Sequence, residues 1–212
     1  MLTKFIRGVS TMNLWEALEK RRSIRKYKDT PVSKEVLLKL VDAAKLAPNN
    51  ANVQPWEFVF ITDAGLVSKV NEHIRMTMTE YWSKARVEEL PEEKLKKIIN
   101  STTNLGPVPV YLLVCINTSA GKMREDYMKW NDMWNHYSTA AALDNLMLAA
   151  VEEGLGTCWL GVPSWNTDKL KEELAIPNEV DIISVTPIGY PDEDPAPRPR
   201  KATEEISHFN KW

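Results

Sequence analysis

Hydrophobic residues occur at two different periods along this 212-residue chain. Three short runs, WEFVFI, YLLVCI and VDIISVTPIGY, predict β-strands over 56–61, 111–116 and 180–190. Elsewhere apolar residues recur every three or four positions, as on one face of an amphipathic helix. Because the two patterns are mixed along the chain, with no low-complexity linker and no internal repeat, we predict one α+β domain.

Capping residues indicate where several of the helices begin. Asn13 is followed by Glu16 in a capping-box arrangement, and Ser33 precedes a second apolar stripe. The polar stretch 63–100 has helical character, and Pro91 within it predicts the start of a new helix. The first 60 residues or so are therefore expected to give two helices and a strand, followed by a polar helical region.

The second half of the chain contains the most apolar helix, predicted over 136–153, with Gly154 as its stop. A shorter helix is predicted over about 167–175. The segment 191–201 has four prolines and no periodicity, so we expect it to be extended.

Charge and composition exclude several classes of protein. Lys plus Arg number 27 and Asp plus Glu 29, a balance that disfavours a non-specific nucleic-acid binder. No apolar run approaches the ~18 residues of a membrane span, so we expect no membrane partner. Two cysteines, Cys115 and Cys158, are too few for a disulfide framework and favour the cytoplasm. The three histidines are far apart along the chain, so no metal site is predicted.

Three arginines and a serine occupy five consecutive positions, Arg21, Arg22, Ser23, Ile24 and Arg25, at the end of the first helix. Guanidinium groups match the geometry of phosphate, and a hydroxyl adds a neutral donor. Taken alone, the segment is more typical of a solvated basic helix end. Arg198 and Arg200 alternate with proline in the tail and would supply further phosphate ligands, or simply keep the tail soluble.

A second group of polar residues lies in the loop between a helix and the first strand. Asn49, Asn50, Asn52 and Gln54 have amides that match the donor and acceptor edge of a heterocycle. Asn is also favoured in turns for local reasons.

The segment GLGTCWLG (154–161) follows a helix rather than a strand, and Trp159 stands where a dinucleotide fingerprint requires its third glycine. Its glycines instead suggest a backbone that approaches a flat group closely, or a helix stop and a turn. Cys158 as a nucleophile with His136 as its base has no supporting neighbours, and we predict no catalytic side chain.

In their order and spacing these motifs resemble the nitroreductase family of FMN-dependent oxidoreductases. RRSIRKY is similar to the family's Arg-Arg-Ser-x-Arg motif, APNNANVQPWEFVFI to its polar loop ending in Gln-Pro-Trp, and PIGYPDEDPAPRPRK to its C-terminal motif. The resemblance implies one domain over residues 12–206, with a variable lid at about 72–100 and a C-terminal arm over 191–212.

The fold implied by the resemblance is an α/β sandwich, a central, mostly antiparallel sheet flanked by helices. It also implies an intertwined homodimer with FMN at the subunit interface, in which the arm packs on the partner.

The resemblance further assigns roles to individual residues. Arg21, Ser23 and Arg200 would bind the FMN phosphate with help from Arg198, and Arg22 would contact the ribityl chain. Arg25 would lie near N1 and the C2 oxygen of the flavin. The remaining contacts would come from the polar loop of the partner and from the backbone N–H groups of two residues near flavin N5, namely Asn49, Asn50, Asn52 and Gln54, and Leu160 and Gly161.

The implied activity is hydride transfer from NADH or NADPH through flavin N5 to a small oxidised acceptor, by a ping-pong mechanism. Nitroaromatics, quinones and activated alkenes are the acceptors expected. The halotyrosine dehalogenase branch uses a Glu four residues before a lid Tyr, whereas Thr77 precedes Tyr81 here, so that branch is disfavoured. The alternative is a non-catalytic flavin-binding or storage protein, or a dimeric scaffold of the same fold.

Overall fold

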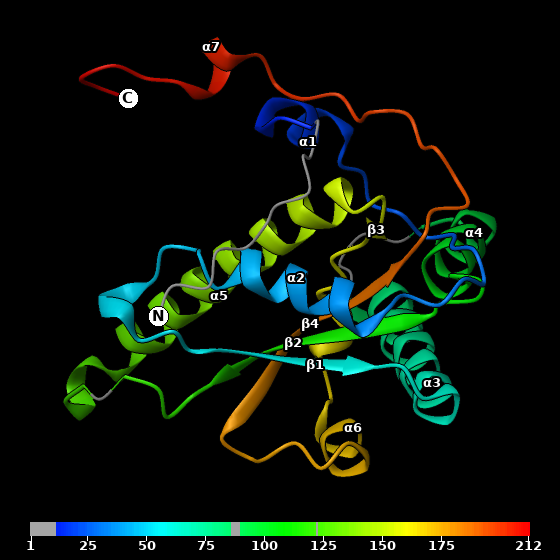
Figure 1. Ribbon diagram of the computed structural model, residues 1–212, viewed down its shortest axis with the longest axis horizontal. Helices are drawn as coiled ribbons and strands as arrows, with labels where there is room; N and C mark the ends of the chain where they lie inside the picture. Colours follow the sequence, from blue (N-terminus) through cyan, green and yellow to red (C-terminus); the bar gives the residue numbers. More distant parts are fainter. Residues whose placement is uncertain (1–11, 86–89, 122) are drawn as a thin grey trace.

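The computed structural model describes residues 12–85, 90–121 and 123–212. A four-stranded sheet in the order β1-β2-β4-β3 lies at its centre (Figure 1). Its strands are β1 (Trp56–Ile61), β2 (Val110–Asn117), β3 (Gly156–Thr157) and β4 (Val180–Gly189), and all their pairings are antiparallel. The three strands predicted from sequence are confirmed to within a residue or so, whereas the two-residue β3 was not predicted.

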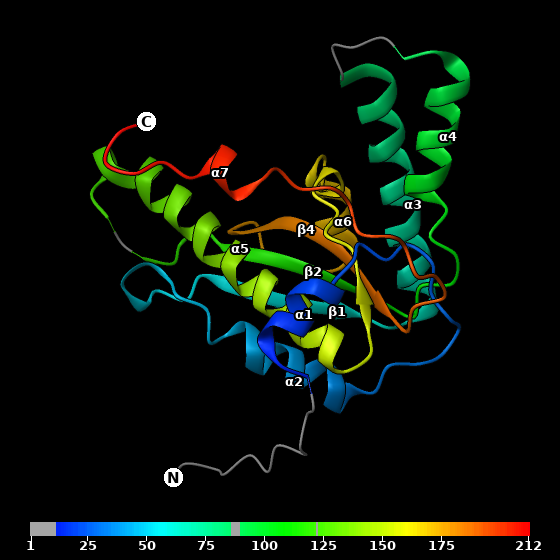
Figure 2. The same ribbon diagram turned by 90° about the horizontal axis from the view of Figure 1, so that it is seen from above.

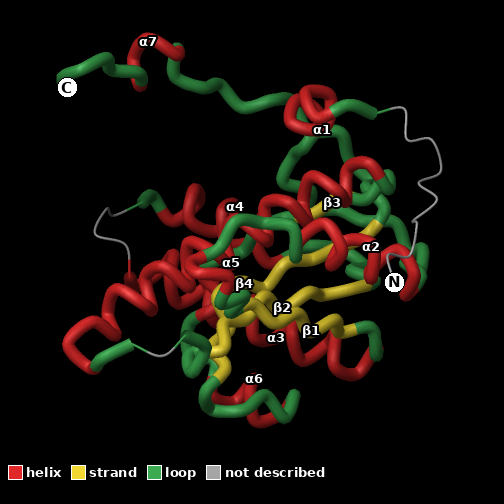
Figure 3. Tube along the Cα trace, turned by 60° about the vertical axis from the view of Figure 1, so that its left-hand side comes forward, coloured by secondary structure: helices red, strands yellow, loops and turns green. Residues whose placement is uncertain are grey.

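Helices cover both faces of the sheet (Figures 1 and 3). One face packs against α2 (Lys34–Ala44) and the long α5 (Met128–Glu152), and the other against α3 (Ala64–Glu80) and α6 (Asp168–Glu173). Side chains of β2 alternate between the two layers, and every residue from Val110 to Ile116 is buried. A strand covered on both faces requires a continuous apolar run, which explains YLLVCI.

The first helix, α1 (Leu14–Lys20), begins at the predicted capping box. Asn13 Oδ1 accepts from the Glu16 N–H and a Glu16 carboxylate oxygen accepts from the Asn13 N–H, both at 3.1 Å. Leu14, Trp15 and Leu18 of α1 are exposed. The predicted cap at Ser33 is also present, with its hydroxyl accepting from Val36 N–H.

The predicted start of the longest helix was wrong by eight residues, because α5 begins at Met128 rather than at 136. Its first half buries Asn131 and Asn135 instead of apolar side chains. Their amides donate to the backbone oxygens of Ala120 and Gly121, so this half of the helix has a polar buried face that hydrophobic periodicity does not detect. The helix ends as predicted at Gly154, which has a φ of +72°.

Two segments project from the sandwich. The helices α3 and α4 (Glu92–Thr103) form a pair that extends beyond the sheet (Figure 2). A short π-helical turn, Tyr81–Ala85, ends the first of them, and residues 86–89 of the predicted lid lie outside the described residues. The chain after β4 runs as an extended arm, as predicted for 191–201, to the short helix α7 (Thr203–Ile206) (Figure 1). No helix of the described residues has the length and apolar character needed to cross a bilayer.

Two leucines of α2 provide a matched test of the core. Leu40 is fully buried between α2 and the sheet, whereas Leu38 is 51% exposed on the same helix. Leu40→Ala is expected to lower the free energy of unfolding by about 2–5 kcal/mol. Leu38→Ala is expected to change it by no more than about 0.5 kcal/mol. Urea denaturation measures both, and equal losses would contradict this placement of α2.

Candidate functional site

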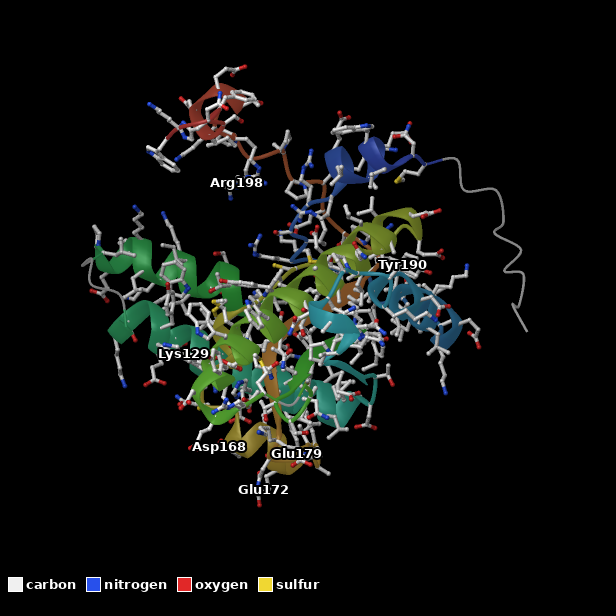
Figure 4. All side chains as sticks on the ribbon, turned by 90° about the vertical axis from the view of Figure 1, so that its left-hand side faces the viewer. Lys129, Asp168, Glu172, Glu179, Tyr190 and Arg198 are labelled. Atoms are coloured by element: carbon white, nitrogen blue, oxygen red, sulfur yellow. The ribbon has the colours of Figure 1, made fainter. Side chains whose placement is uncertain are left out.

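A cleft of about 630 Å³ lies between the end of α1 and the C-terminal arm. One wall comes from residues 18–25 and the other from residues 195–200, which are about 170 positions later in the chain. The structure therefore brings together six of the twelve residues predicted to bind FMN, namely Arg21, Arg22, Ser23, Arg25, Arg198 and Arg200. Figure 4 shows Arg198 on the arm beyond Tyr190, where the arm leaves the sheet.

The cleft carries a large excess of positive charge. Five guanidinium groups line it, and Glu19 is its single acidic lining residue among the described residues. Within the described part of the chain no carboxylate forms an ion pair with Arg21, Arg198 or Arg200. Like charges held together without acidic partners repel one another, and a bound anion relieves this repulsion.

Two of the arginines are held by their own backbone. The guanidinium of Arg22 donates to the carbonyl oxygens of Glu19 and Arg21, so it caps the C-terminal end of α1. Arg25 Nη1 donates to the Ser23 carbonyl oxygen at 3.3 Å. Arg22 therefore has the role of a basic residue at a helix end, the alternative considered for this segment. The guanidinium of Arg21 remains available to a ligand.

The arginine segment is held against the sheet by a close backbone contact. Ser23 and Thr157 form a parallel bridge, and the Ile24 N–H donates to the Thr157 carbonyl oxygen at 2.9 Å. A Cβ added at Gly156 would lie 2.7 Å from Ile24 Cγ1, so this approach requires glycine. The glycines of GLGTCWLG suggested a backbone that closely approaches another group. At Gly156 that group is the Ile24 side chain.

The polar loop lies elsewhere on the chain. Residues 49–54 contact the first half of α5, away from the end of α1 (Figures 1 and 2), and the Asn50 N–H donates to Ser138 Oγ at 3.1 Å. The loop is closed by Gln54 N–H donating to Asn49 Oδ1 at 3.0 Å. Within a single chain, the amide side chains of 49–54 therefore do not reach the arginines predicted to bind phosphate.

The conformation of this loop is strained. Ala51, Asn52 and Gln54 have φ values of +46°, +58° and +51°, in the left-handed region that non-glycine residues rarely adopt. The Asn50 N–H is bonded to one member, Ser138, of a buried polar stripe on α5 that hydrophobic periodicity does not detect. The stripe consists of four buried polar residues, namely Asn131, Asn135, Ser138 and Thr139.

Leu160 and Gly161 lie where the chain turns away from the sheet. Leu160 is buried and its carbonyl oxygen accepts from the Val185 N–H at 3.1 Å. Gly161 is exposed, and a Cβ built on it meets nothing within 4 Å. Space is therefore open beside the Gly161 backbone, as an approaching ligand requires.

The turn that follows is fixed by a buried histidine. His73 of α3 is 6% exposed, and its Nε2 lies 2.7 Å from the Pro163 carbonyl oxygen. His73 is buried here because α3 packs directly on this turn.

The two cysteines are buried and free of disulfides. Burial raises the pKa of the Cys115 thiol to about 12, and burial also raises the pKa of the Cys158 thiol. Thiols that stay protonated are poor nucleophiles. No cluster of three metal-ligating side chains occurs among the residues that the structure describes.

The family model for nitroreductases matches residues 18–190 of this sequence. This chain belongs to the nitroreductase family. A relative from Methanothermobacter thermautotrophicus, provisionally named as an NADH dehydrogenase/NAD(P)H nitroreductase, is 29% identical over 96% of this chain and 90% of its own length. The iodotyrosine deiodinase of Thermotoga neapolitana is also 29% identical, over 94% of this chain and 98% of its own.

Among solved structures, an oxidised iodotyrosine deiodinase bound to FMN and 3-iodo-L-tyrosine superposes with a TM-score of 0.77. It is 25% identical and the match covers 94% of this chain and 100% of that one. The predicted α+β nitroreductase-like fold is thereby confirmed.

The glycines of 154–161 supply a matched test of the arginine segment. Gly156→Ala places a methyl group against Ile24 and is expected to lower the free energy of unfolding by about 1–3 kcal/mol. Gly161→Ala enters open space at a φ of −81° and is expected to change it by less than about 0.5 kcal/mol. Urea denaturation without added flavin is the measurement. A larger loss at Gly161 than at Gly156 would show that the contact with Ile24 is misplaced.

Proposed function

We propose that this nitroreductase-family protein is an FMN-dependent oxidoreductase that uses NADH or NADPH to reduce a small oxidised acceptor. The observation that carries the proposal is the cleft of five arginines, whose guanidinium groups form no ion pair with a carboxylate among the described residues. A phosphate monoester bears nearly two negative charges and suits such a site. The deiodinase that superposes on this chain is bound to FMN, which agrees with this assignment.

Each binding residue has a proposed role in holding FMN. Arg21, Ser23 and Arg200 bind the phosphate, and Arg198 assists them. Arg25, which is partly buried next to Ser23, supplies positive charge beside N1 and the C2 oxygen. Arg22 contacts the ribityl chain with whatever donors its bonds to the α1 carbonyls leave available.

A homodimer supplies the remaining contacts in this proposal. Asn49, Asn50, Asn52 and Gln54 do not line the arginine cleft of their own chain, so they are proposed to reach the flavin of the partner. The arm over 191–212 carries three apolar side chains that are each at least 62% exposed, namely Ile206, Phe209 and Trp212. Such an apolar surface is suited to contact with a second copy of the chain. The whole unit, residues 12–206 with a lid at about 72–100, is proposed to act as one domain.

When bound, FMN supplies two-electron chemistry at N5, accepting hydride from NADH or NADPH and passing it on in a ping-pong cycle. The chain contributes binding, orientation and charge. The N–H groups of Leu160 and Gly161 are proposed to face N5, and the guanidinium of Arg25 to stabilise negative charge that develops on the ring. Nitroaromatics, quinones and activated alkenes are the acceptors we propose.

Halotyrosines are not among the proposed substrates, despite the similarity to deiodinases. The residue four positions before Tyr81 is Thr77, which is fully buried, and its hydroxyl donates to the His73 carbonyl oxygen at 2.8 Å. It presents no carboxylate to a ligand. The cytoplasm remains our proposed compartment, because both cysteines are free and buried.

The purified protein is expected to be yellow and to release FMN rather than FAD on denaturation. Anaerobic NADH or NADPH should bleach the flavin absorbance, and a small acceptor should restore it. Light scattering on the same sample should give the mass of two chains. Bound flavin that no nicotinamide donor bleaches would indicate a storage protein instead, and the absence of flavin binding would indicate a scaffold. FAD as the main extracted flavin would refute the assignment of FMN.

Two arginines of the cleft are expected to fail in different ways. Arg200→Ala removes a phosphate partner and should weaken FMN binding about 10-fold or more, with little change in the midpoint potential of bound flavin. Arg25→Ala removes a cation beside the ring, where charge develops on reduction, and should lower the midpoint potential and slow hydride uptake.

Flavin and potentiometric titrations on both variants make this comparison. An unchanged midpoint potential in flavin-saturated Arg25→Ala would show that Arg25 does not lie at the ring. If neither variant changed the FMN affinity or the midpoint potential, the two arginines would be solvated surface charges with no role in flavin binding.

A further inference from the structure

The C-terminal arm begins as an added strand beside the arginine segment. The Lys28 N–H donates to the Tyr190 carbonyl oxygen at 2.9 Å, and the Asp192 N–H donates to the Lys26 carbonyl oxygen at 3.0 Å. These bonds continue the main chain of β4 past its last sheet residue. They connect two parts of the sequence that lie more than 160 positions apart and that both lead into the arginine cleft.

Glu193 closes this junction with its side chain. Its Oε1 accepts from the backbone N–H of Arg25 at 2.5 Å and from that of Lys26 at 3.2 Å. Glu193 is half-buried, whereas its neighbours Asp192 and Asp194 are exposed. Bonds from backbone N–H groups to an ionised carboxylate are among the stronger hydrogen bonds in proteins, so this carboxylate is a firm attachment point.

Beyond Glu193 the arm has no further backbone attachment before the cleft. Residues 194–201 make no backbone hydrogen bond to any described residue, and three of them are prolines, which lack a donor. An extended proline-rich chain advances about 3 Å per residue, so Arg198 and Arg200 lie roughly 15–22 Å along the arm from this attachment. A small change of direction at Glu193 therefore displaces both guanidinium groups by a large distance.

We propose that Glu193 is a positioning residue of the FMN site. Its carboxylate clamps the arm to the backbone of Arg25 and Lys26, and this clamp sets Arg198 and Arg200 across the cleft from Arg21. The hydrogen bonds of the clamp are present in the chain itself. Only the identity of the ligand as FMN rests on the proposed function. Glu193 acts through the arginines and not through contact with the flavin.

Three variants isolate the clamp. Glu193→Ala removes the acceptor, and Glu193→Gln keeps an acceptor oxygen without the charge. Asp192→Asn removes a carboxylate one residue earlier on the arm, where the side chain is exposed and the attachment uses the backbone. It is the matched control for the loss of one negative charge.

Hydrogen exchange on the flavin-free protein tests the clamp directly. Glu193→Ala should speed exchange of the Arg25 and Lys26 amides, with exchange in β2 unchanged as a check that the sheet is folded. Glu193→Gln should restore much of the protection, and Asp192→Asn should match the wild type. Unchanged Arg25 and Lys26 exchange in Glu193→Ala would overturn the proposal.

Parallel titrations with FMN and riboflavin test the consequence for the phosphate. Because the clamp positions phosphate ligands, Glu193→Ala should weaken FMN binding about 10-fold, the loss expected for one charged hydrogen bond, and leave riboflavin binding near the wild-type value. Glu193→Gln should recover most of the FMN affinity. Equal losses for both flavins, or no loss for FMN, would refute the positioning role. Failure of the wild type to bind FMN would refute the proposed function and the phosphate role with it, while the exchange result would still decide the clamp.

Discussion

The contact between Ile24 and Gly156 is the constraint on which the candidate site depends. It allows the Ile24 N–H to reach the Thr157 carbonyl oxygen, so the arginine segment lies against the edge of the sheet. The arm then pairs with the other side of the same segment through residues 190–193. Ile24 and its neighbours are thus held from both sides, and the guanidinium groups project from a backbone that is fixed.

The arginines of the cleft are held in place without neutralising their charge. Five arginines close together oppose the folded state unless an anion is bound, and only one acidic side chain among the described residues lines their cleft. The attachments that hold them are uncharged backbone bonds, a helix cap at Arg22 and the carboxylate of Glu193. The positive charge of Arg21, Arg198 and Arg200 therefore remains available to a phosphate group.

The sequence predicted the secondary structure well wherever apolar periodicity or a cap carried the signal. The run 111–116 gave a strand buried on both faces, Asn13 and Glu16 gave a capping box, and Gly154 gave a helix end at positive φ. Prediction failed at the first half of α5, because Asn131 and Asn135 are buried by hydrogen bonds to loop carbonyls and not by hydrophobic packing. No local pattern reveals such a partner.

For the site, the sequence by itself determined which residue types are present: arginines at two distant positions, a polar amide loop, and glycines in 154–161. Only the tertiary structure decided that residues 21–25 and 198–200 share one cleft, and that the amides of 49–54 do not share it within the same chain. It also decided that Gly156 serves the contact with Ile24 and that Glu193 joins the two arginine groups. The physical reason is that these contacts join residues more than a hundred positions apart, whereas periodicity and caps report on neighbours within a few residues.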